Sequence, residues 1–431
     1  MKLKHLFILF ATTFLLCSCS EDDSPTPVLA LENTELDIEA NGGDYIVGIN
    51  SSSQWTMTTA PVWISCQSSE RQDQILIKVN ENLQRAERSA NITITNEENL
   101  TQTIVLRQKA YTFSENHRYK LPVVFHTLYW NQNNKQHYVE EAQLQKLLER
   151  VNHYYANSGV DMNVEFVMAE EDPDGNRLTE PGINRKKWQY TTMDCSIFMG
   201  SGQEQYKKLL WDTDRYVNVV LYNFSDPLVM GIAQFPWMPA PYELPGAGQM
   251  AQGADPDSNP YPQCVSINNK YIYDLPDEGD VYSMSNVAVT LSHELGHFLG
   301  LYHAFNQQNN GNTNTNEDTD YCMDTPPYNK YLYDNTLNAY FNTHPEITSK
   351  SSKDYLQYVM RTNSKNMEQF RSTNIMDYAI SDANRFTSEQ AARVKYTLQH
   401  ALFMPGPKDY SETDLRTKGN SEFEFTPQYI E

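Results

Sequence analysis

The segment from His293 to His303 constrains the fold of this chain most strongly, because it spaces three imidazoles and one carboxylate for metal binding. His293 and His297 are four residues apart, so on a helix their side chains project from one face, one turn apart. Each can place a ring nitrogen about 2.0–2.1 Å from one zinc ion. Glu294 then reaches a water beside the ion, which predicts a catalytic base.

The third histidine requires that the helix end before it. His303 cannot share the face of His293 and His297 on a straight helix, but Gly300 can adopt the left-handed conformation that turns the chain back beneath the metal. His303 then completes a three-histidine site. Three protein ligands leave a fourth position for water, which distinguishes a catalytic zinc site from a closed structural one.

A second motif lies downstream, at Ser372–Tyr378. With the histidine segment it resembles the metzincin peptidases, in which a methionine turn lies beneath the zinc ligands. The resemblance assigns that place to Met376, which by itself would more often be a core residue. It assigns to Tyr378 the tyrosine that approaches the metal or donates to the developing oxyanion, so Glu294 and Tyr378 are the expected catalytic residues.

The order of these motifs, with Asp324–Pro326 between them, is most similar to the pappalysin family. Matching segments also occur at Leu121–His126, Gly231–Pro236 and Phe386–Gln390, so the resemblance covers most of residues 118–402. It implies a zinc metalloendopeptidase with one catalytic zinc ion. The expected substrates are extracellular proteins, peptides or glycoproteins, including host glycoproteins, which are cleaved by a water that zinc and Glu294 activate.

The amino terminus predicts export. Two lysines precede an apolar run from Leu6 to Leu16, which is typical of a secretory signal and too short to span a membrane. The residues around Cys19 resemble a bacterial lipobox, which implies removal of residues 1–18 and lipid on Cys19. Ser20–Asp23 looks like the acidic surface-export tag of Bacteroidota lipoproteins, or is a solvated linker. We therefore expect a lipidated tether over residues 19–27 and an outer-membrane lipoprotein at the cell surface.

The charge balance excludes some partners. The formal net charge is −22, so nucleic acid is not an expected partner and no basic membrane-binding face is indicated. Membrane contact is expected through the N-terminal lipid only.

Residues 28–109 predict a β-sandwich. Short alternating runs such as Ile75–Val79 are separated by turn-forming clusters such as Asn41–Asp44. Trp55 and Trp63 are expected in the core, and a sugar-stacking surface is the alternative. The unit resembles the BACON domain, which implies either glycan contact or a spacer.

The chain is therefore expected to be multidomain, with an N-terminal all-β sandwich (BACON-like, Ig-like) followed by a mixed α/β (α+β) metzincin catalytic domain over residues 110–403. Apolar periodicity predicts helices over 139–156 and 286–299, the second with Ser285 as its N-cap. Thr387 and Gln390 predict a capping box on the last helix. Residues 404–431 are expected to form a loose tail.

Two segments are candidates for the rim of the substrate cleft. Cys264–Asn268 resembles the pappalysin upper-rim strand, on which an extended substrate lies by backbone hydrogen bonds, although a buried internal strand would show the same apolar pattern. Met238–Tyr261 is rich in Pro, Gly and Ala and is either a mobile rim loop or an inert surface excursion.

Pappalysin relatives often carry disulfides in this region, and by that resemblance Cys264 and Cys322 are the preferred pair, with Cys195 as a competitor. Relatives can also carry calcium near the oxygen-rich loop that ends at Asp324. Its candidate calcium ligands, which lack a regular calcium-loop spacing, are Asp318, Asp320 and Asp324. Asp324 could instead cap or brace the chain.

A surface glycan-binding or adhesion lipoprotein with a latent or accessory metzincin domain is the alternative function. The intact set of histidines and Glu294 favours the peptidase.

Overall fold

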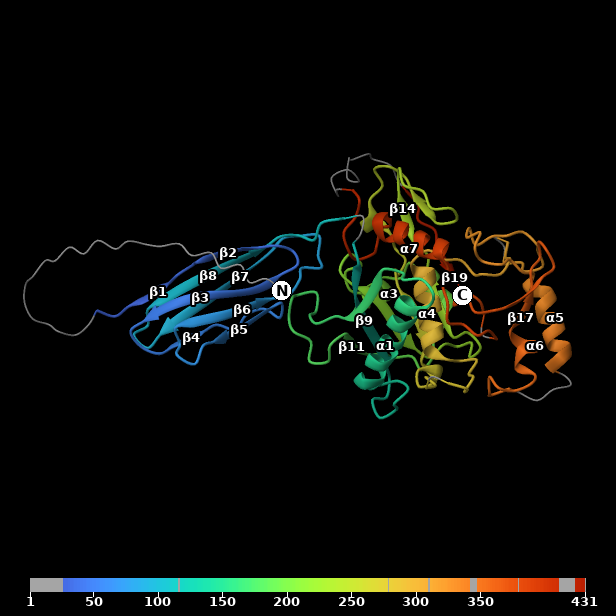
Figure 1. Cartoon of the computed structure of the whole chain (residues 1–431), viewed down its shortest axis with the longest axis horizontal. Helices are drawn as coiled ribbons and strands as arrows, with labels where there is room; N and C mark the ends of the chain where they lie inside the picture. Colours follow the sequence, from blue (N-terminus) through green and yellow to red (C-terminus); the bar gives the residue numbers. More distant parts are fainter. Residues whose placement is uncertain are drawn as a thin grey trace, which may run out of the picture.

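The computed structural model describes residues 26–114, 117–277, 279–308, 311–341, 347–378, 380–410 and 423–430. The predicted signal and Cys19 lie outside these residues. A β-rich N-terminal region and a larger α/β region lie side by side along the long axis (Figure 1). None of the helices within the described residues is long and apolar enough to cross a bilayer.

The N-terminal region contains two four-stranded sheets, with strand orders β1-β3-β6-β5 and β2-β8-β7-β4. The strands of the first sheet are β1 (Leu29–Leu31), β3 (Gly43–Ser51), β6 (Gln74–Val79) and β5 (Ile64–Ser68). Those of the second are β2 (Glu35–Ile38), β8 (Thr101–Gln108), β7 (Arg88–Asn96) and β4 (Trp55–Met57).

Period-two alternation explains how these sheets share one core. Strand β6 buries Ile75, Ile77 and Val79 and exposes the residues between them. Trp55 and Trp63 lie in the same core, 5% and 7% exposed, as the core-packing interpretation predicted. The expectation of a β-rich N-terminal region is thus confirmed, and the likeness to the BACON domain stays a resemblance.

The second region is built on a seven-stranded sheet, ordered β10-β9-β12-β16-β13-β19, with β11 also paired to β9. Pairing is parallel from β10 to β16 and antiparallel at β13 and β19. The strands are β9 (Tyr119–Tyr129), β10 (Val164–Met168), β11 (Ile183–Lys187), β12 (Val217–Tyr222), β13 (Gly231–Gln234), β16 (Val265–Asn268) and β19 (Tyr429–Ile430).

Helices cover both faces of this sheet, which is why its central strands are buried along their whole length. Val219 and Leu221 of β12 face the core beneath α1 (Glu141–Asn157) and α4 (Val287–Phe298). The intervening Val220 faces the cluster formed with α2 (Cys195–Gly200) and α3 (Glu204–Lys207). The expectation of an α/β catalytic region is confirmed.

The strand predicted to form the rim of the substrate cleft does not lie at the edge of the sheet. Strand β16, within the predicted rim strand Cys264–Asn268, lies inside the sheet between β12 and β13. The open alternative, a buried internal strand, is the correct one, because all four residues of β16 are buried, as in a strand that is covered on both faces. The antiparallel strand next to β16 is β13, and the short strand β19 pairs with its outer side.

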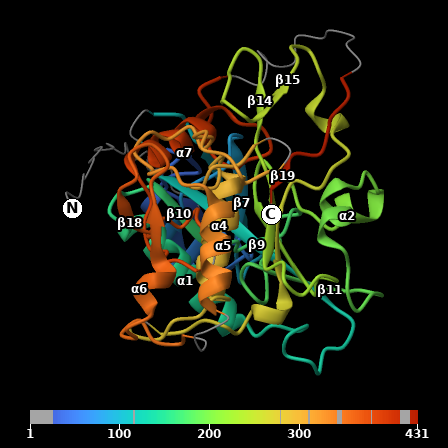
Figure 2. The ribbon, with the colours of Figure 1, turned by 90° about the vertical axis from the view of Figure 1, so that its right-hand side faces the viewer.

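The remaining elements surround the site. Met238–Tyr261 is not a structureless loop, since it contains most of the pair β14 (Trp237–Pro239) and β15 (Gly248–Met250) and the turn η1 (Pro256–Ser258). Figure 2 shows α5 (Lys330–Phe341) in front of α4, with α6 (Tyr355–Val359) to its left. These outer elements are η2 (Asn269–Tyr271), α5 (Lys330–Phe341), α6 (Tyr355–Val359), β17 (Met360–Thr362) and β18 (Gln369–Arg371).

The predicted capping box is present at the last helix, α7 (Ser388–His400), where Thr387 accepts from the Gln390 backbone and the Gln390 side chain accepts from Thr387. The predicted cap at Ser285 is wrong. Asn286 caps α4 instead, accepting a hydrogen bond from the Ala288 N–H at 3.1 Å, because the Ser285 hydroxyl already donates to Asp274.

The expectation of a loose tail from residue 404 is also wrong for the part that the structure describes. The Lys408 ammonium is buried and donates to the Leu398 carbonyl at 2.7 Å. Phe425 is buried beside Trp237, and β19 joins the sheet. The prolines and charged residues of this segment predicted a loose tail. Its aromatic residues instead pack against residues that are distant in the sequence.

Polar contacts join the two regions. Arg85 of the N-terminal region donates to the Gly406 carbonyl at 2.8 Å and to the Met404 carbonyl at 2.9 Å. Glu81 accepts from the Lys120 ammonium at 2.6 Å. The β-rich region is therefore docked against the residues that follow α7 and against β9.

Candidate active site

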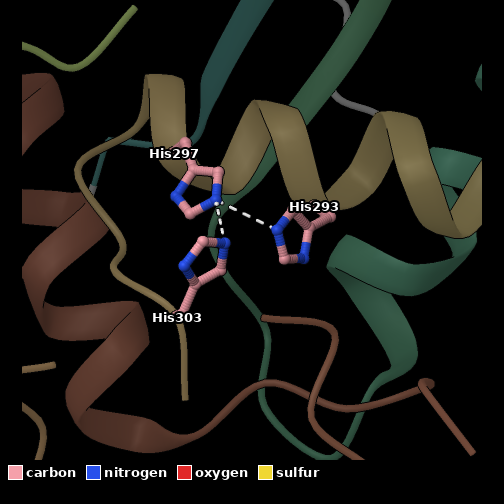
Figure 3. Close-up of side chains that lie close together, drawn as sticks. All are labelled: His293, His297 and His303. Carbon is pink, nitrogen blue, oxygen red and sulfur yellow. Dashed lines mark hydrogen bonds between the residues drawn. The ribbon is translucent and has the colours of Figure 1, made fainter. Parts of the chain in front are cut away.

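Three histidine rings converge at the end of α4 (Figure 3). His293 and His297 project from one face of the helix, and His303 comes from the chain that follows it. The Nε2 atom of His297 lies 3.0 Å from that of His293 and 3.1 Å from that of His303. Within the part of the chain that the structure describes, these residues form the only group of three or more His, Cys, Asp or Glu side chains with ligand atoms mutually within 4.8 Å.

Each ring is oriented from its other nitrogen. His293 Nδ1 donates to the Ile375 carbonyl at 2.7 Å, and His297 Nδ1 donates to the Leu301 carbonyl at 2.7 Å. His303 Nδ1 lies 2.8 Å from Gln307 Oε1, which accepts from it. Carbonyl oxygens only accept, so the proton stands on Nδ1 and the lone pair on Nε2 faces the common point.

Burial keeps the rings of His293 and His297 uncharged. It lowers the pKa of His293 to about 4, although the hydrogen bond that His293 donates to the Ile375 carbonyl opposes this shift. It also lowers the pKa of His297 well below its usual value, and the neighbouring His293 and His303 lower it further. Neutral imidazoles with converging lone pairs are the donors that zinc prefers, and tetrahedral zinc would separate the nitrogens by about 3.3 Å. The residues therefore fit the ion.

The turn that brings in His303 depends on Gly300, as predicted. Its φ is +92°, and the Leu301 N–H returns to the Gly296 carbonyl at 2.8 Å. Arg393 of α7 donates to the Gly300 carbonyl at 2.5 Å, which fixes the turn from outside. Sequence reasoning found the glycine but not this arginine, because their sequence separation gives no signal.

Glu294 is buried next to the metal-binding point and faces the edge strand. A Cβ added to Gly231 would lie 2.5 Å from Glu294 Cγ, so only glycine allows β13 to approach so closely. The sequence marked Gly231 as part of a matching segment without giving a reason for the glycine. Close contact between the Glu294 side chain and β13 is the reason.

Met376 packs beneath the ligands. Its side chain is fully buried against Gly296 of α4, and its carbonyl accepts from the Ala304 N–H at 2.9 Å. The turn is thereby linked both to the zinc helix and to the chain that carries His303. This is the placement that the metzincin resemblance implied.

A buried ion pair supports the same turn and was not anticipated from the sequence. Arg361 lies 3.2 Å from Asp377, and the Tyr328 hydroxyl donates to Asp377 at 2.5 Å. Burial is the largest single effect and opposes the charge on Arg361, but Asp377, Tyr328 and Tyr333 together raise the pKa of the guanidinium above its usual value. Asp377 in turn accepts from the Tyr378 N–H at 2.7 Å, which positions the tyrosine backbone.

Tyr378 stands at the mouth of the site, 38% exposed. Its ring meets that of His303 edge-on at 4.7 Å between centroids and that of Phe305 at 4.8 Å. The ring is therefore fixed by packing beside the third histidine while one side stays open to the cleft.

Two hollows flank this centre. A cavity of about 350 Å³ is lined by His293 and Glu294 together with apolar residues that include Leu228 and Met284. A second, of about 460 Å³, is lined by His303 and Tyr378. The three histidines thus lie between two spaces that can hold neighbouring parts of one extended ligand.

Two expectations about the surrounding loops are not met. The four described cysteines all have free thiols, so Cys264 and Cys322 are not bridged. The Cys264 thiol is buried 3.7 Å from Met199 Sδ in the cluster on the far face of the sheet. Cys322 instead lies in the loop after α4, where its N–H donates to Asp320 at 2.9 Å.

The candidate calcium ligands do not form one cation-binding group. Asp318 pairs with Lys365 at 2.7 Å, and Asp324 accepts from the Glu389 N–H at 3.0 Å. Burial raises the pKa of Asp320 to about 7, against the hydrogen bond from Thr325. The alternative interpretation of Asp324, bracing the chain, agrees with its contact at the start of α7.

Residues 200–399 match the family model described as pregnancy-associated plasma protein-A. Mature mirolysin of Tannerella forsythia in complex with a cleaved peptide is 22% identical, with a TM-score of 0.41, and the match covers 64% of this chain and 90% of that one. A promirolysin mutant from the same organism is 22% identical, with a TM-score of 0.44, over 67% of this chain and 83% of that one.

No curated protein matches the chain significantly. The TM-scores are below 0.5, so the assignment rests on the family match and on the histidine group that lies within it. The chain is a zinc metalloendopeptidase, and its residues 200–399 match the pappalysin family model.

Proposed function

We propose that this protein hydrolyses internal peptide bonds of extracellular proteins, with His293, His297 and His303 as the zinc ligands and Glu294 as general base. The observation that carries the proposal is the convergence of three Nε2 atoms whose Nδ1 partners are already satisfied. Three ligands leave a position open, which a structural site would not.

The chain's own groups supply the proton transfers. Where it is bound, zinc supplies Lewis acidity that acidifies a water and polarises the carbonyl under attack. Glu294 takes the proton from the attacking water and delivers it to the leaving amine, since it lies between the histidines and the β13 edge. The Tyr378 hydroxyl donates to the carbonyl oxygen as negative charge develops there.

The substrate is an extended segment rather than a folded surface. Strand β13 offers a backbone edge beside Glu294, and the two flanking cavities can take side chains on either side of the cleaved bond. We propose that glycoproteins at the cell surface are among the substrates, since the first residues resemble an export signal and the residues around Cys19 resemble a lipobox. Lipid on Cys19 would hold the enzyme at the outer membrane, with residues 20–27 as a tether.

The test measures metal content and peptide cleavage by the purified full chain and by Glu294→Gln. About one zinc per chain in both proteins, with cleavage only in the first and lost under chelation, is the expected result. Retained hydrolysis in the variant would remove Glu294 from the mechanism. Absence of zinc from a folded chain would remove the proposal itself.

Glycan binding by the N-terminal region is the second candidate. Arg88 places its guanidinium 4.4 Å over the Trp63 ring, in a cavity of about 590 Å³ between the two regions. Trp63 is otherwise buried in the core, which leaves little ring surface for a sugar. Binding of the full chain to immobilised mucin, with loss of binding in Trp63→Ala, would favour this role over that of a spacer.

A further inference from the structure

The last described residues of the chain lie along the cleft-side edge of the sheet. Tyr429 stands opposite Gln234, and Ile430 stands opposite Ala233, in antiparallel register. The Phe235 N–H donates to the Gln428 carbonyl. A segment of this chain therefore occupies an edge that would otherwise present unpaired backbone groups.

This segment runs toward the catalytic carboxylate. Gly231, at the start of β13, is the residue that contacts Glu294. Because the pairing is antiparallel, each successive residue of β19 lies opposite a β13 residue closer to Gly231. The direction of the segment is thus along the cleft, from Phe235 toward Glu294.

The segment also borders one of the two hollows beside the site. Residues 427–430 line the cavity of about 460 Å³ together with His303 and Tyr378. Phe235, Tyr302 and Phe305 complete its aromatic wall. The same space that would take the side chains of an extended substrate is bordered by the chain's own backbone and side chains.

Aromatic contacts anchor the segment. Phe425 is 4% exposed, and its ring lies edge-on to Trp237 at 4.9 Å between centroids. Phe423 meets the same two rings at 4.9 and 5.9 Å. Tyr429 packs on Gly200, where an added Cβ would lie 3.3 Å from its ring. These contacts dock the segment on the domain at two separate points.

We propose that residues Thr426–Ile430 act as an internal occupant of the β13 edge and compete with substrate for it. The inference rests on the proposed function, because it identifies this edge as the substrate-binding strand. Strand addition is how an extended peptide gains affinity at a sheet edge, and the segment already makes that pairing. A substrate must therefore displace it. The apparent affinity for substrate is then the intrinsic affinity multiplied by the fraction of molecules whose β13 edge is free.

Steady-state kinetics of three variants measure this competition. The full chain is compared with a chain shortened by residues 423–431 and with Phe425→Ala, which removes an anchor but leaves β13 intact. If the segment occupies the edge about nine-tenths of the time, KM falls about tenfold in both while kcat is unchanged. Tyr190→Ala, an exposed aromatic residue outside β13 and β19, is the matched control and should leave KM unchanged. Equal KM values in all four proteins would overturn the inference.

A binding measurement separates this inference from the proposed function. A fluorescent peptide with the sequence of residues 423–431 is titrated, up to about 1 mM, against the shortened chain carrying Glu294→Gln. Saturable binding, with none for a scrambled peptide, is expected whether or not any form cleaves substrate. Absence of binding to a folded shortened chain overturns the internal-occupant proposal and leaves the peptidase proposal to its own test.

Discussion

The sulfur of Met376 lies against Gly296 so closely that a Cβ on Gly296 would be only 2.4 Å from it. Glycine in the middle of a helix costs about 1 kcal/mol relative to alanine, so its presence between two ligands of the site needs a packing reason. The methionine turn supplies that reason.

Gly296→Ala should therefore destabilise the fold by about 1–3 kcal/mol, despite the better helix propensity of alanine, because Met376 must move. Denaturant unfolding and zinc content measure the effect. The matched test adds Met376→Ala, which removes the clash, so the double variant should lose less stability than the sum of the single changes. Strict additivity would show that the two residues do not interact.

Tyr378→Phe removes only the hydroxyl and keeps the ring packed against His303 and Phe305. If the hydroxyl donates to the developing oxyanion, kcat should fall about 10²-fold with KM and zinc content unchanged. Stopped or continuous peptide assays give both constants. An unchanged kcat would leave Tyr378 with a packing role alone.

Gln307 orients His303 from the side opposite the metal-binding point, with 2.8 Å between Oε1 and Nδ1. Gln307→Ala should weaken zinc binding about 10-fold to 100-fold, because the ring loses its fixed tautomer and orientation. Competition with a chromophoric chelator measures the affinity. Gln307→Glu, which keeps an acceptor in place, should retain tight binding; equal losses in both variants would contradict an orienting role.

His126 should make stability depend on pH. Its ring is buried, with Nε2 donating to Asn218 at 2.8 Å and Nδ1 accepting from Asn184 at 2.9 Å. Burial lowers its pKa to about 4, although the Asn218 contact opposes the shift. The unfolded chain binds the proton near pH 6.5, so this contribution is present above that pH and is lost as pH falls toward 4, by about 3 kcal/mol.

Unfolding free energies at pH 7 and pH 4.5 test this in the native chain and in His126→Gln. Other groups titrate in both proteins, so the informative quantity is the difference between their pH dependences. The glutamine variant should show a shallower loss of stability toward acid. Parallel curves would mean that His126 contributes nothing to acid unfolding.

The elements that sequence reasoning placed correctly are those in which local pattern and chemistry coincide. The spacing of the three histidines with Gly300, the α7 capping box and the alternation in β6 are all set by residues within one or two turns of each other. Each has a geometric reason that holds before any tertiary contact forms. The expected positions therefore agree with the structure.

The misplaced features depend on contacts between distant segments. Nothing local distinguishes β16 from β13, since each mixes apolar with polar residues and is buried along its whole length. The pairing of Tyr429 and Ile430 with β13, and the support of Gly300 by Arg393, join residues far apart in the chain. The free thiols of Cys264 and Cys322 follow from their positions in separate parts of the fold.

The contacts of Arg85 determine whether the peptidase region can be produced without the N-terminal region. Its guanidinium satisfies two backbone carbonyls just beyond α7, the helix that also fixes the Gly300 turn through Arg393. A fragment that begins after residue 109 would lack Arg85 and would leave those two carbonyls to solvent. They lie just beyond α7, and α7 supports the turn at the metal-binding end of α4. The N-terminal region thus serves as a structural brace for the peptidase, and the two are best produced as one piece.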